Sequence, residues 1–157
     1  MKKLSRLEAV LWNIAFPGFS QLIIGQYFKG VLFVLLEIVL NVMSRFNRAI
    51  MYSFLGEIKK AEAVIDYQWL MFYPCLYMFS MWDGYRSAMP DNERYSFLPF
   101  VSCAYFVTVG LMVSPKVSIF QIHPGPVFLP MLFLIPGLLV GFLFKYLLAF
   151  FNKSQMG

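Results

Sequence analysis

Five apolar segments separated by polar links dominate the chain and restrict what it can fold into. The segments comprise about residues 7–24, 31–43, 67–82, 97–113 and 127–151. A helix of about 20 apolar residues is long enough to cross the hydrocarbon core of a bilayer. Composition agrees, because 60% of the residues are hydrophobic and 13% are charged, whereas about 25% are charged in a typical soluble domain. We therefore expect residues 1–157 to form one all-α, polytopic integral membrane domain.

The first apolar segment is interrupted at Pro17-Gly18. A proline inside a helix removes a backbone hydrogen bond, and in hydrocarbon the freed groups need partners from neighbouring protein or from water. Gly18, Gly25 and Gly30 lack side chains and let two backbones approach closely. The Gln21 amide is able to bond the exposed backbone. We therefore expect a broken or re-entrant segment, a packing corner rather than a ligand or ion site, in a bundle of four to five transmembrane helices.

The link between the second and third segments is long and amphipathic. Over residues 44–66 many residues are charged, and apolar residues recur three and four positions apart, as at Met51, Phe54 and Ile58. This spacing is typical of a helix that lies at the membrane interface with its apolar face in the headgroup region. We predict one amphipathic interfacial helix around residues 48–62.

The motif around the interruption resembles that of a known family. The motif reads Pro17-Gly18-x-x-Gln21-x-x-x-Gly25-Gln26-x-x-x-Gly30. An apolar helix follows it, and Trp82-Asp83 closes a later segment. Over about residues 7–88 this combination resembles the bacterial two-transmembrane-helix (TM-two) domain proteins. Two positions differ, because Ser20 stands where that family has Gly or His, and Ile23 stands where it has Tyr. The resemblance implies a fold and a bacterial plasma-membrane location more than an activity, and residues 95–151 add a helix pair outside it.

Three residues form a candidate intramembrane polar site. Glu37 and Asn41 lie on one face of the second segment, and Lys145 lies in the fifth. A carboxylate at the bilayer centre is costly unless it is protonated, paired or facing water, and Lys145 is an available cation partner. We favour a structural bond that holds helices together at this site, either Glu–Lys or Glu–amide, and the alternative is an ion or proton transfer step at Glu37. Lys145 has a second interpretation, in which its stem snorkels to the interface.

Asp83 and Arg86 lie at the end of the third segment, beside Trp82. Tryptophan is typical of headgroup depth, and a spacing of three places the two charges within one helical turn. We interpret this charge pair as a helix terminus and a packing contact. In the last segment, Gly137-x-x-x-Gly141 permits close contact with another helix, either within the chain or in a second copy.

Signatures of enzymes and of metal sites are missing from the sequence. It contains no GxSxG, Walker-type or HExxH motif. Cys75 and Cys103 lie in apolar runs without metal-binding spacing, so we expect free thiols, no metal and no cofactor. The net charge of +5 comes from basic residues that flank apolar runs, which indicates contact with lipid headgroups and not with nucleic acid.

These observations predict a small bacterial multi-pass membrane protein without catalytic activity. We expect it to act as an accessory, scaffold or regulatory partner of a membrane complex, bound to another membrane protein or to a second copy of itself. The alternative is a small channel or an ion- or proton-coupled transporter subunit that uses Glu37.

Basic residues predict the orientation. With five crossing segments, or with four and a re-entrant first segment, the N-terminal side carries eight Lys and Arg residues against five on the other side. The positive-inside rule therefore places the N-terminus in the cytoplasm in both arrangements. The arrangements differ at the C-terminus, which lies outside with five crossings and inside with four. The broken first segment favours four.

Overall fold

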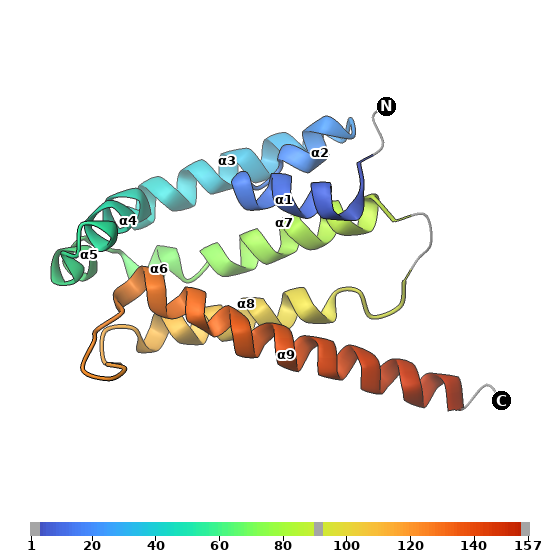
Figure 1. Cartoon of the computed structure of the whole chain (residues 1–157). Helices are drawn as coiled ribbons and strands as arrows, with labels where there is room; N and C mark the ends of the chain where they lie inside the picture. Colours follow the sequence, from blue (N-terminus) through green and yellow to red (C-terminus); the bar gives the residue numbers. More distant parts are fainter. Residues whose placement is uncertain (1–3, 90–92, 155–157) are drawn as a thin grey trace.

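Helices form nearly all of the regular structure of the protein. The computed structural model describes residues 4–89 and 93–154 (Figure 1). The helices in these ranges are α1 (Arg6–Ala15), α2 (Phe19–Ile23), α3 (Tyr27–Ser44), α4 (Phe46–Phe54), α5 (Ile58–Val64), α6 (Tyr67–Leu70), α7 (Tyr73–Ser87), α8 (Leu98–Val113) and α9 (Gly125–Ser154). The described residues contain no strand beyond one isolated bridge between Ile119 and Ile122. The expected all-α fold is confirmed.

The first apolar segment forms a helical hairpin. α1 begins with a capping box, in which the Ser5 hydroxyl accepts from the Glu8 N–H and the Glu8 carboxylate accepts from the Ser5 N–H. The helix ends at Ala15, before Pro17 and before Gly18, whose φ of 102° is left-handed. After this corner α2 returns towards the end at which α1 began (Figure 1). The predicted break at Pro17-Gly18 is confirmed.

Contacts with α7 show that the hairpin enters and leaves at one end of the molecule. At the start of α1, the Arg6 guanidinium lies 5.7 Å from the centre of the Tyr85 ring. Just before α3, the Gln26 amide donates to the Ser87 hydroxyl at 3.3 Å. Tyr85 and Ser87 both belong to the last turn of α7, so the two ends of the hairpin lie side by side. Gly25 forms the turn from α2 into α3.

Four longer helical stretches run alongside one another between the two ends of the molecule: α3, α6 with α7, α8, and α9 (Figure 1). Among the described residues, two helices, Tyr27–Ser44 and Gly125–Asn152, are long and apolar enough by length and composition to cross a membrane, and Leu98–Val113 is a shorter apolar helix. α7 packs against α1, α3 and α8, and α8 packs along α9. α1 begins and α9 ends at the same end of the molecule (Figure 1).

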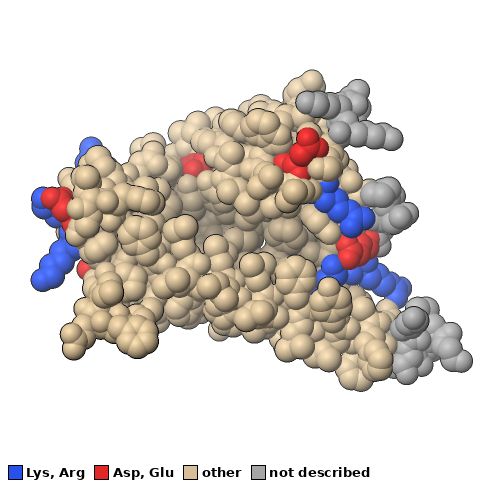
Figure 2. Space-filling model, viewed as in Figure 1, with Lys and Arg blue, Asp and Glu red and all other residues tan. Residues whose placement is uncertain are grey.

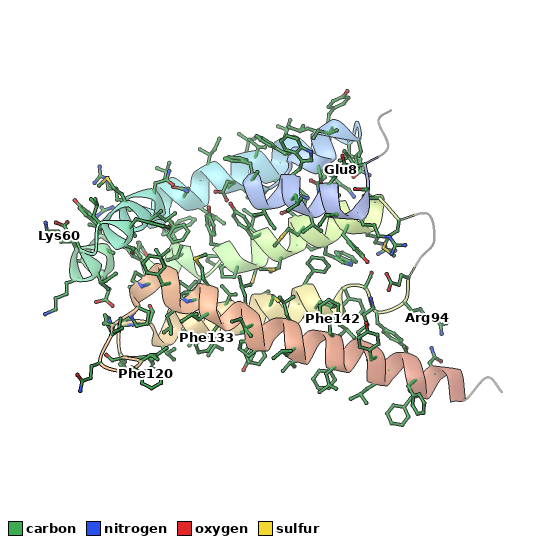
Figure 3. All side chains as sticks on the ribbon, viewed as in Figure 1. Glu8, Lys60, Arg94, Phe120, Phe133 and Phe142 are labelled. Carbon is green, nitrogen blue, oxygen red and sulfur yellow. The ribbon has the colours of Figure 1, made fainter. Side chains whose placement is uncertain are left out.

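Charged side chains gather at the two ends, and the face between them is almost entirely uncharged (Figure 2). Lys60 lies at one end, and Glu8 and Arg94 lie at the other (Figure 3). Along the middle of the molecule, large apolar side chains such as Leu35 (55% exposed) and Leu139 (68% exposed) face outwards. The face in Figure 2 therefore carries an apolar belt between two charged rims.

The predicted single interfacial helix over residues 48–62 is wrong, because two short helices occupy this region. α4 ends in a Schellman motif, in which the Glu57 N–H donates to the Tyr52 carbonyl at 2.8 Å and the Gly56 N–H to the Ser53 carbonyl at 3.1 Å. Gly56 takes the left-handed conformation, with a φ of 78°, that this motif requires. Apolar residues keep their helical spacing on both sides of Gly56, so the periodicity did not predict that the helix ends there.

Small residues bring α8 and α9 into backbone contact. A Cβ atom added at Gly137 would lie 2.9 Å from the Cys103 Cα, and one added at Gly141 would lie 2.5 Å from the Pro99 Cα. Gly110 of α8 makes the reciprocal approach, because its added Cβ would lie 2.9 Å from the Pro130 Cα. The close helix contact predicted for Gly137-x-x-x-Gly141 is thus confirmed within the chain.

We predict that Gly141→Ala destabilises the protein. Alanine favours a helix interior over glycine by about 1 kcal/mol, but forcing a methyl group into a packed contact costs about 1–3 kcal/mol. The apparent melting temperature in mild detergent should therefore fall. Leu139→Ala, on the exposed face of the same helix, should change it little. A higher melting temperature for Gly141→Ala would show that α8 and α9 are not in contact there.

Candidate functional site

A buried polar cluster joins the N-terminal hairpin to α7. At its centre, the fully buried Asn13 of α1 makes three hydrogen bonds through its side chain. Its Nδ2 atom donates to the Ser20 Oγ at 2.6 Å and to the Ser80 carbonyl at 2.9 Å. Its Oδ1 atom accepts from the Gly18 N–H at 2.9 Å. One amide thus satisfies the backbone at the corner and also connects that corner to another helix.

Gln21 extends the cluster towards the charged rim. Its Oε1 atom accepts from the Ser20 hydroxyl at 3.0 Å. Its Nε2 atom donates to the Ser80 carbonyl at 3.0 Å and to the Asp83 Oδ2 at 3.1 Å. Asn13 and Gln21 therefore converge on a single carbonyl of α7. We call Asn13, Gly18, Ser20, Gln21, Ser80 and Asp83 the polar corner.

The polar corner depends on glycines at its close approaches. A Cβ atom added at Gly84 would lie 2.5 Å from the Asn13 Nδ2, so α7 presents a bare backbone to this amide. A Cβ atom added at Gly18 would lie 2.5 Å from the Gly30 carbonyl oxygen. The fully buried Pro17 precedes this contact. The predicted packing role of the corner is consistent with these contacts, which leave no space for a bound molecule between the two backbones.

Asp83 is paired differently from the sequence-based expectation. Its Oδ1 atom lies 2.8 Å from the Lys29 Nζ, and its other oxygen accepts from Gln21. Arg86 instead places its guanidinium 5.3 Å from the centre of the Trp82 ring. The expected Asp83–Arg86 pair is therefore wrong. Sequence spacing within one helix could not show that the turn before α3 brings Lys29 to this carboxylate.

Glu37 lies apart from the polar corner, between α3 and α7. It is 3% exposed, and its Oε1 atom accepts a hydrogen bond from the Tyr73 hydroxyl. Its Oε2 atom has no hydrogen-bond partner among the described residues. Glu37 and Asn41 both line a cavity of about 140 Å³. The Asn41 amide donates to the Asn47 Oδ1 at 3.1 Å. Glu37 thus joins two helices through a tyrosine.

Lys145, which the sequence offered as a possible cation partner of Glu37, pairs with another carboxylate. The Lys145 Nζ lies 2.6 Å from Glu93, in the link before α8. Arg6 approaches the same carboxylate at 3.6 Å. The hydrogen bond from Lys145 lowers the pKa of the Glu93 carboxyl below its ordinary value, against a smaller opposing effect of burial. The long lysine stem places the ammonium group at the charged rim, as snorkelling predicts, and away from the middle of α3.

Sequence reasoning missed Asn13, Ser80, Gly84 and Tyr73 as members of these sites. One signal was present for Asn13, an amide inside an apolar segment a few residues before a proline. Ser80 acts through its backbone carbonyl and Gly84 through a missing side chain, so neither has a chemical signature in sequence. Tyr73 could be assigned to Glu37 only after the packing of α3 on α7 was known.

Both sites are built from amides, hydroxyls and single carboxylates that bond to one another. In the described part of the chain, no group of three or more His, Cys, Asp or Glu residues is arranged to hold a metal ion. No protein-family model matches the chain, and neither a curated protein nor a solved structure matches it significantly.

We predict that Asn13→Ala strongly destabilises the fold. The substitution leaves the buried Gly18 N–H without its partner, and an unsatisfied buried polar group costs about 1–3 kcal/mol. The denaturation midpoint in mild detergent should fall accordingly. Asn47→Ala is the matched control, because Asn47 is exposed and makes a single side-chain hydrogen bond to Asn41. Equal midpoints for the two variants would mean that the polar corner does not hold the hairpin.

Proposed function

We propose that the protein is a multi-pass membrane protein with four crossing segments and a re-entrant N-terminal hairpin. The apolar belt between two charged rims carries this proposal (Figure 2). The 18 residues of α3 are about 27 Å long, close to the roughly 30 Å of a bilayer's hydrocarbon core. The 10 residues of α1 reach about half as far. An exposed apolar surface of this height is suited to lipid.

The same arrangement favours a cytoplasmic location for both termini. With four crossings, the side of the termini carries eight basic residues, namely Lys2, Lys3, Arg6, Lys29, Arg86, Arg94, Lys145 and Lys153. The other side carries five, namely Arg45, Arg48, Lys59, Lys60 and Lys116. This excess orients the rim near Lys145 and Glu93 towards the cytoplasm by the positive-inside rule. α4 and α5 then lie at the opposite membrane surface.

Within the membrane the protein acts as a non-catalytic accessory, scaffold or regulatory subunit of a complex. Its buried polar groups support this role, because Asn13, Gln21 and Glu37 are used in bonds between helices of the chain itself. The partner is another membrane protein or a second copy, and it meets the exposed faces of α3 or α9. A bacterial plasma membrane is the proposed location.

We also propose a relationship to the TM-two domain proteins. Its support is spatial, because residues of the motif from two separate segments meet at the polar corner. Gly18 contacts Gly30, and Gln21 bonds to Asp83. We propose that the matching positions in those proteins also hold a re-entrant corner against the helix that carries the aspartate.

Reporter fusions test the arrangement in the membrane. A fluorescent protein that matures only in the cytoplasm should be bright when fused at either terminus. A phosphatase that folds only outside the cytoplasm should be active when inserted after Lys116, in the link between α8 and α9, and inactive at the C-terminus. An active C-terminal phosphatase would contradict four crossings, and activity at no position would contradict membrane insertion.

A second candidate function rests on Glu37. Its unpartnered Oε2 atom and the small cavity beside it favour a channel or an ion- or proton-coupled transporter subunit, because buried ionisable groups at membrane depth commonly mark ion pathways. The accessory role remains our choice, since Glu37 holds Tyr73 across the interface between α3 and α7.

Two substitutions of Glu37 separate these functions. Glutamine retains an oxygen that accepts from Tyr73, so Glu37→Gln should keep the native mass and the co-purifying proteins found by mass spectrometry. Glu37→Leu should lose about 1–3 kcal/mol because the Tyr73 hydroxyl is left unsatisfied. Wild-type proteoliposomes should show no ion flux. Wild-type flux that is lost in an intact Glu37→Gln variant would establish the transporter function instead.

A further inference from the structure

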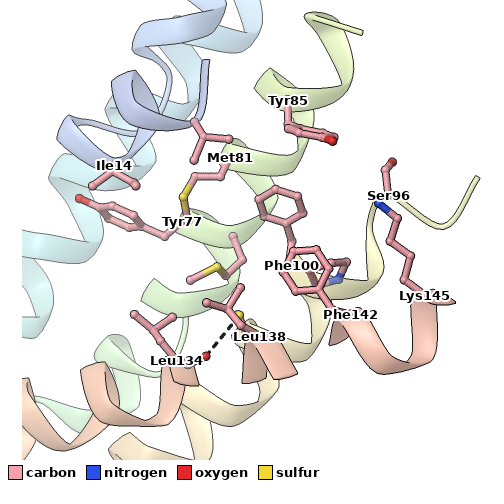
Figure 4. Close-up of a pocket in the computed structure, with 14 residues that line it drawn as sticks. Ile14, Tyr77, Met81, Tyr85, Ser96, Phe100, Leu134, Leu138, Phe142 and Lys145 are labelled. Atoms are coloured by element: carbon pink, nitrogen blue, oxygen red, sulfur yellow. Dashed lines mark hydrogen bonds between the residues drawn. The ribbon is translucent and has the colours of Figure 1, made fainter. Parts of the chain in front are cut away.

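A cavity of about 490 Å³ lies between α1, α7, α8 and α9 (Figure 4). Its walls are mostly apolar and include Ile14, Met81, Phe100, Leu134 and Leu138. The volume lies in the range of about 300–1,000 Å³ that is typical of small-molecule sites. The polar corner and Glu37 do not line this cavity, so its function is separate from theirs.

A charged group lies at one end of the cavity. Lys145 lines that end with Tyr85 and Ser96, and Figure 4 shows these three away from Ile14 and Leu134, whereas Tyr77 lies beside Ile14. Lys145 is paired with Glu93, and Arg6 approaches the same carboxylate. Two cations thus share one carboxylate, so this group of three side chains carries one excess positive charge, although Arg6 lies outside the cavity lining. A ligand with a long apolar part and a single anionic head matches both the walls and the charge.

We propose that this cavity binds an anionic phospholipid of the surrounding bilayer. One acyl chain lies along the apolar walls, and the phosphate lies against Lys145 and Arg6. Basic pockets between transmembrane helices on the cytoplasmic side bind anionic headgroups in this way. The inference rests on the membrane location proposed above, which places the Lys145 end at the cytoplasmic headgroup level and leaves lipid as the neighbouring source of ligand.

The Glu93 carboxylate allows a test in which two substitutions should change lipid affinity in opposite directions. Glu93 competes with the lipid phosphate for Lys145 and Arg6. Glu93→Gln should therefore strengthen binding of the anionic lipid, and Lys145→Gln should weaken it. A merely structural Lys145–Glu93 bond would not produce opposite effects on lipid binding, because either substitution breaks the same ion pair.

Native mass spectrometry provides the measurement. The full chain is delipidated in mild detergent and then mixed with phosphatidylglycerol or with phosphatidylcholine of the same acyl chains. We expect one phosphatidylglycerol per chain and weaker binding of phosphatidylcholine. Lys145→Gln should reduce the phosphatidylglycerol affinity about fivefold, the effect of one basic residue near an anionic lipid surface. Glu93→Gln should increase it by a similar factor.

Two further variants control for charge and for the cavity. Arg86→Gln removes one positive charge from the same rim, but the Arg86 guanidinium lies over the Trp82 ring and not beside Glu93, so the affinity should be unchanged. Ile14 lines the apolar part of the cavity and is 53% exposed, so Ile14→Trp should fold normally, occupy part of the cavity and weaken binding of both lipids. Equal binding of the two lipids, unchanged binding in Ile14→Trp, or no bound lipid would overturn the proposal. If the fusions still report membrane insertion, that failure concerns the lipid site alone.

Discussion

The side-chain amide of Asn13 is the interaction on which the rest of the structure depends. An apolar segment that stops at a proline exposes backbone groups, and these groups need partners before the segment can be buried. Asn13 supplies one at the corner, since it accepts from the Gly18 N–H, and its donation to the Ser80 carbonyl attaches the corner to α7. The close approach of Gly18 to Gly30 brings α3 against the same corner. The hairpin thus contacts both helices, and further along them Tyr73 of α7 donates to Glu37 of α3.

The second half of the chain is attached by a different physical means. α8 and α9 meet through bare backbone at Gly110, Gly137 and Gly141, so close packing replaces hydrogen bonding as the source of specificity. The Lys145–Glu93 pair closes this half at the charged rim. Between α1, α7, α8 and α9 the packing leaves an apolar cavity. The hairpin and α3, which are held by polar contacts, and the closely packed α8 and α9 thus both contact α7. The cavity between α1, α7, α8 and α9 is suited to a lipid chain.

The sequence predicted the features that depend on local chemistry. The helical class, the break at Pro17-Gly18 and the close packing at Gly137 and Gly141 all follow from residue type and spacing. The partners of charged groups did not follow, because Lys145 and Lys29 reach Glu93 and Asp83 from other parts of the chain. Gly56 was missed for another reason, since its left-handed cap lies inside an uninterrupted apolar pattern. Contacts made by a backbone carbonyl, as at Ser80, or by a missing side chain, as at Gly84, cannot be recognised from residue type.

The depth of the hairpin in the bilayer is the most direct test of this account. Single cysteines at Leu7, Ala15 and Tyr27, in a chain with Cys75→Ser and Cys103→Ala, can each carry a nitroxide label, because all three positions are exposed. Electron paramagnetic resonance then compares collisions with oxygen and with a water-soluble nickel chelate. The account predicts shallow labels at Leu7 and Tyr27 and a deep label at Ala15. Depths that increase from Leu7 to Ala15 and end at the opposite headgroup region at Tyr27 would show that the first segment crosses the membrane, and would contradict the account.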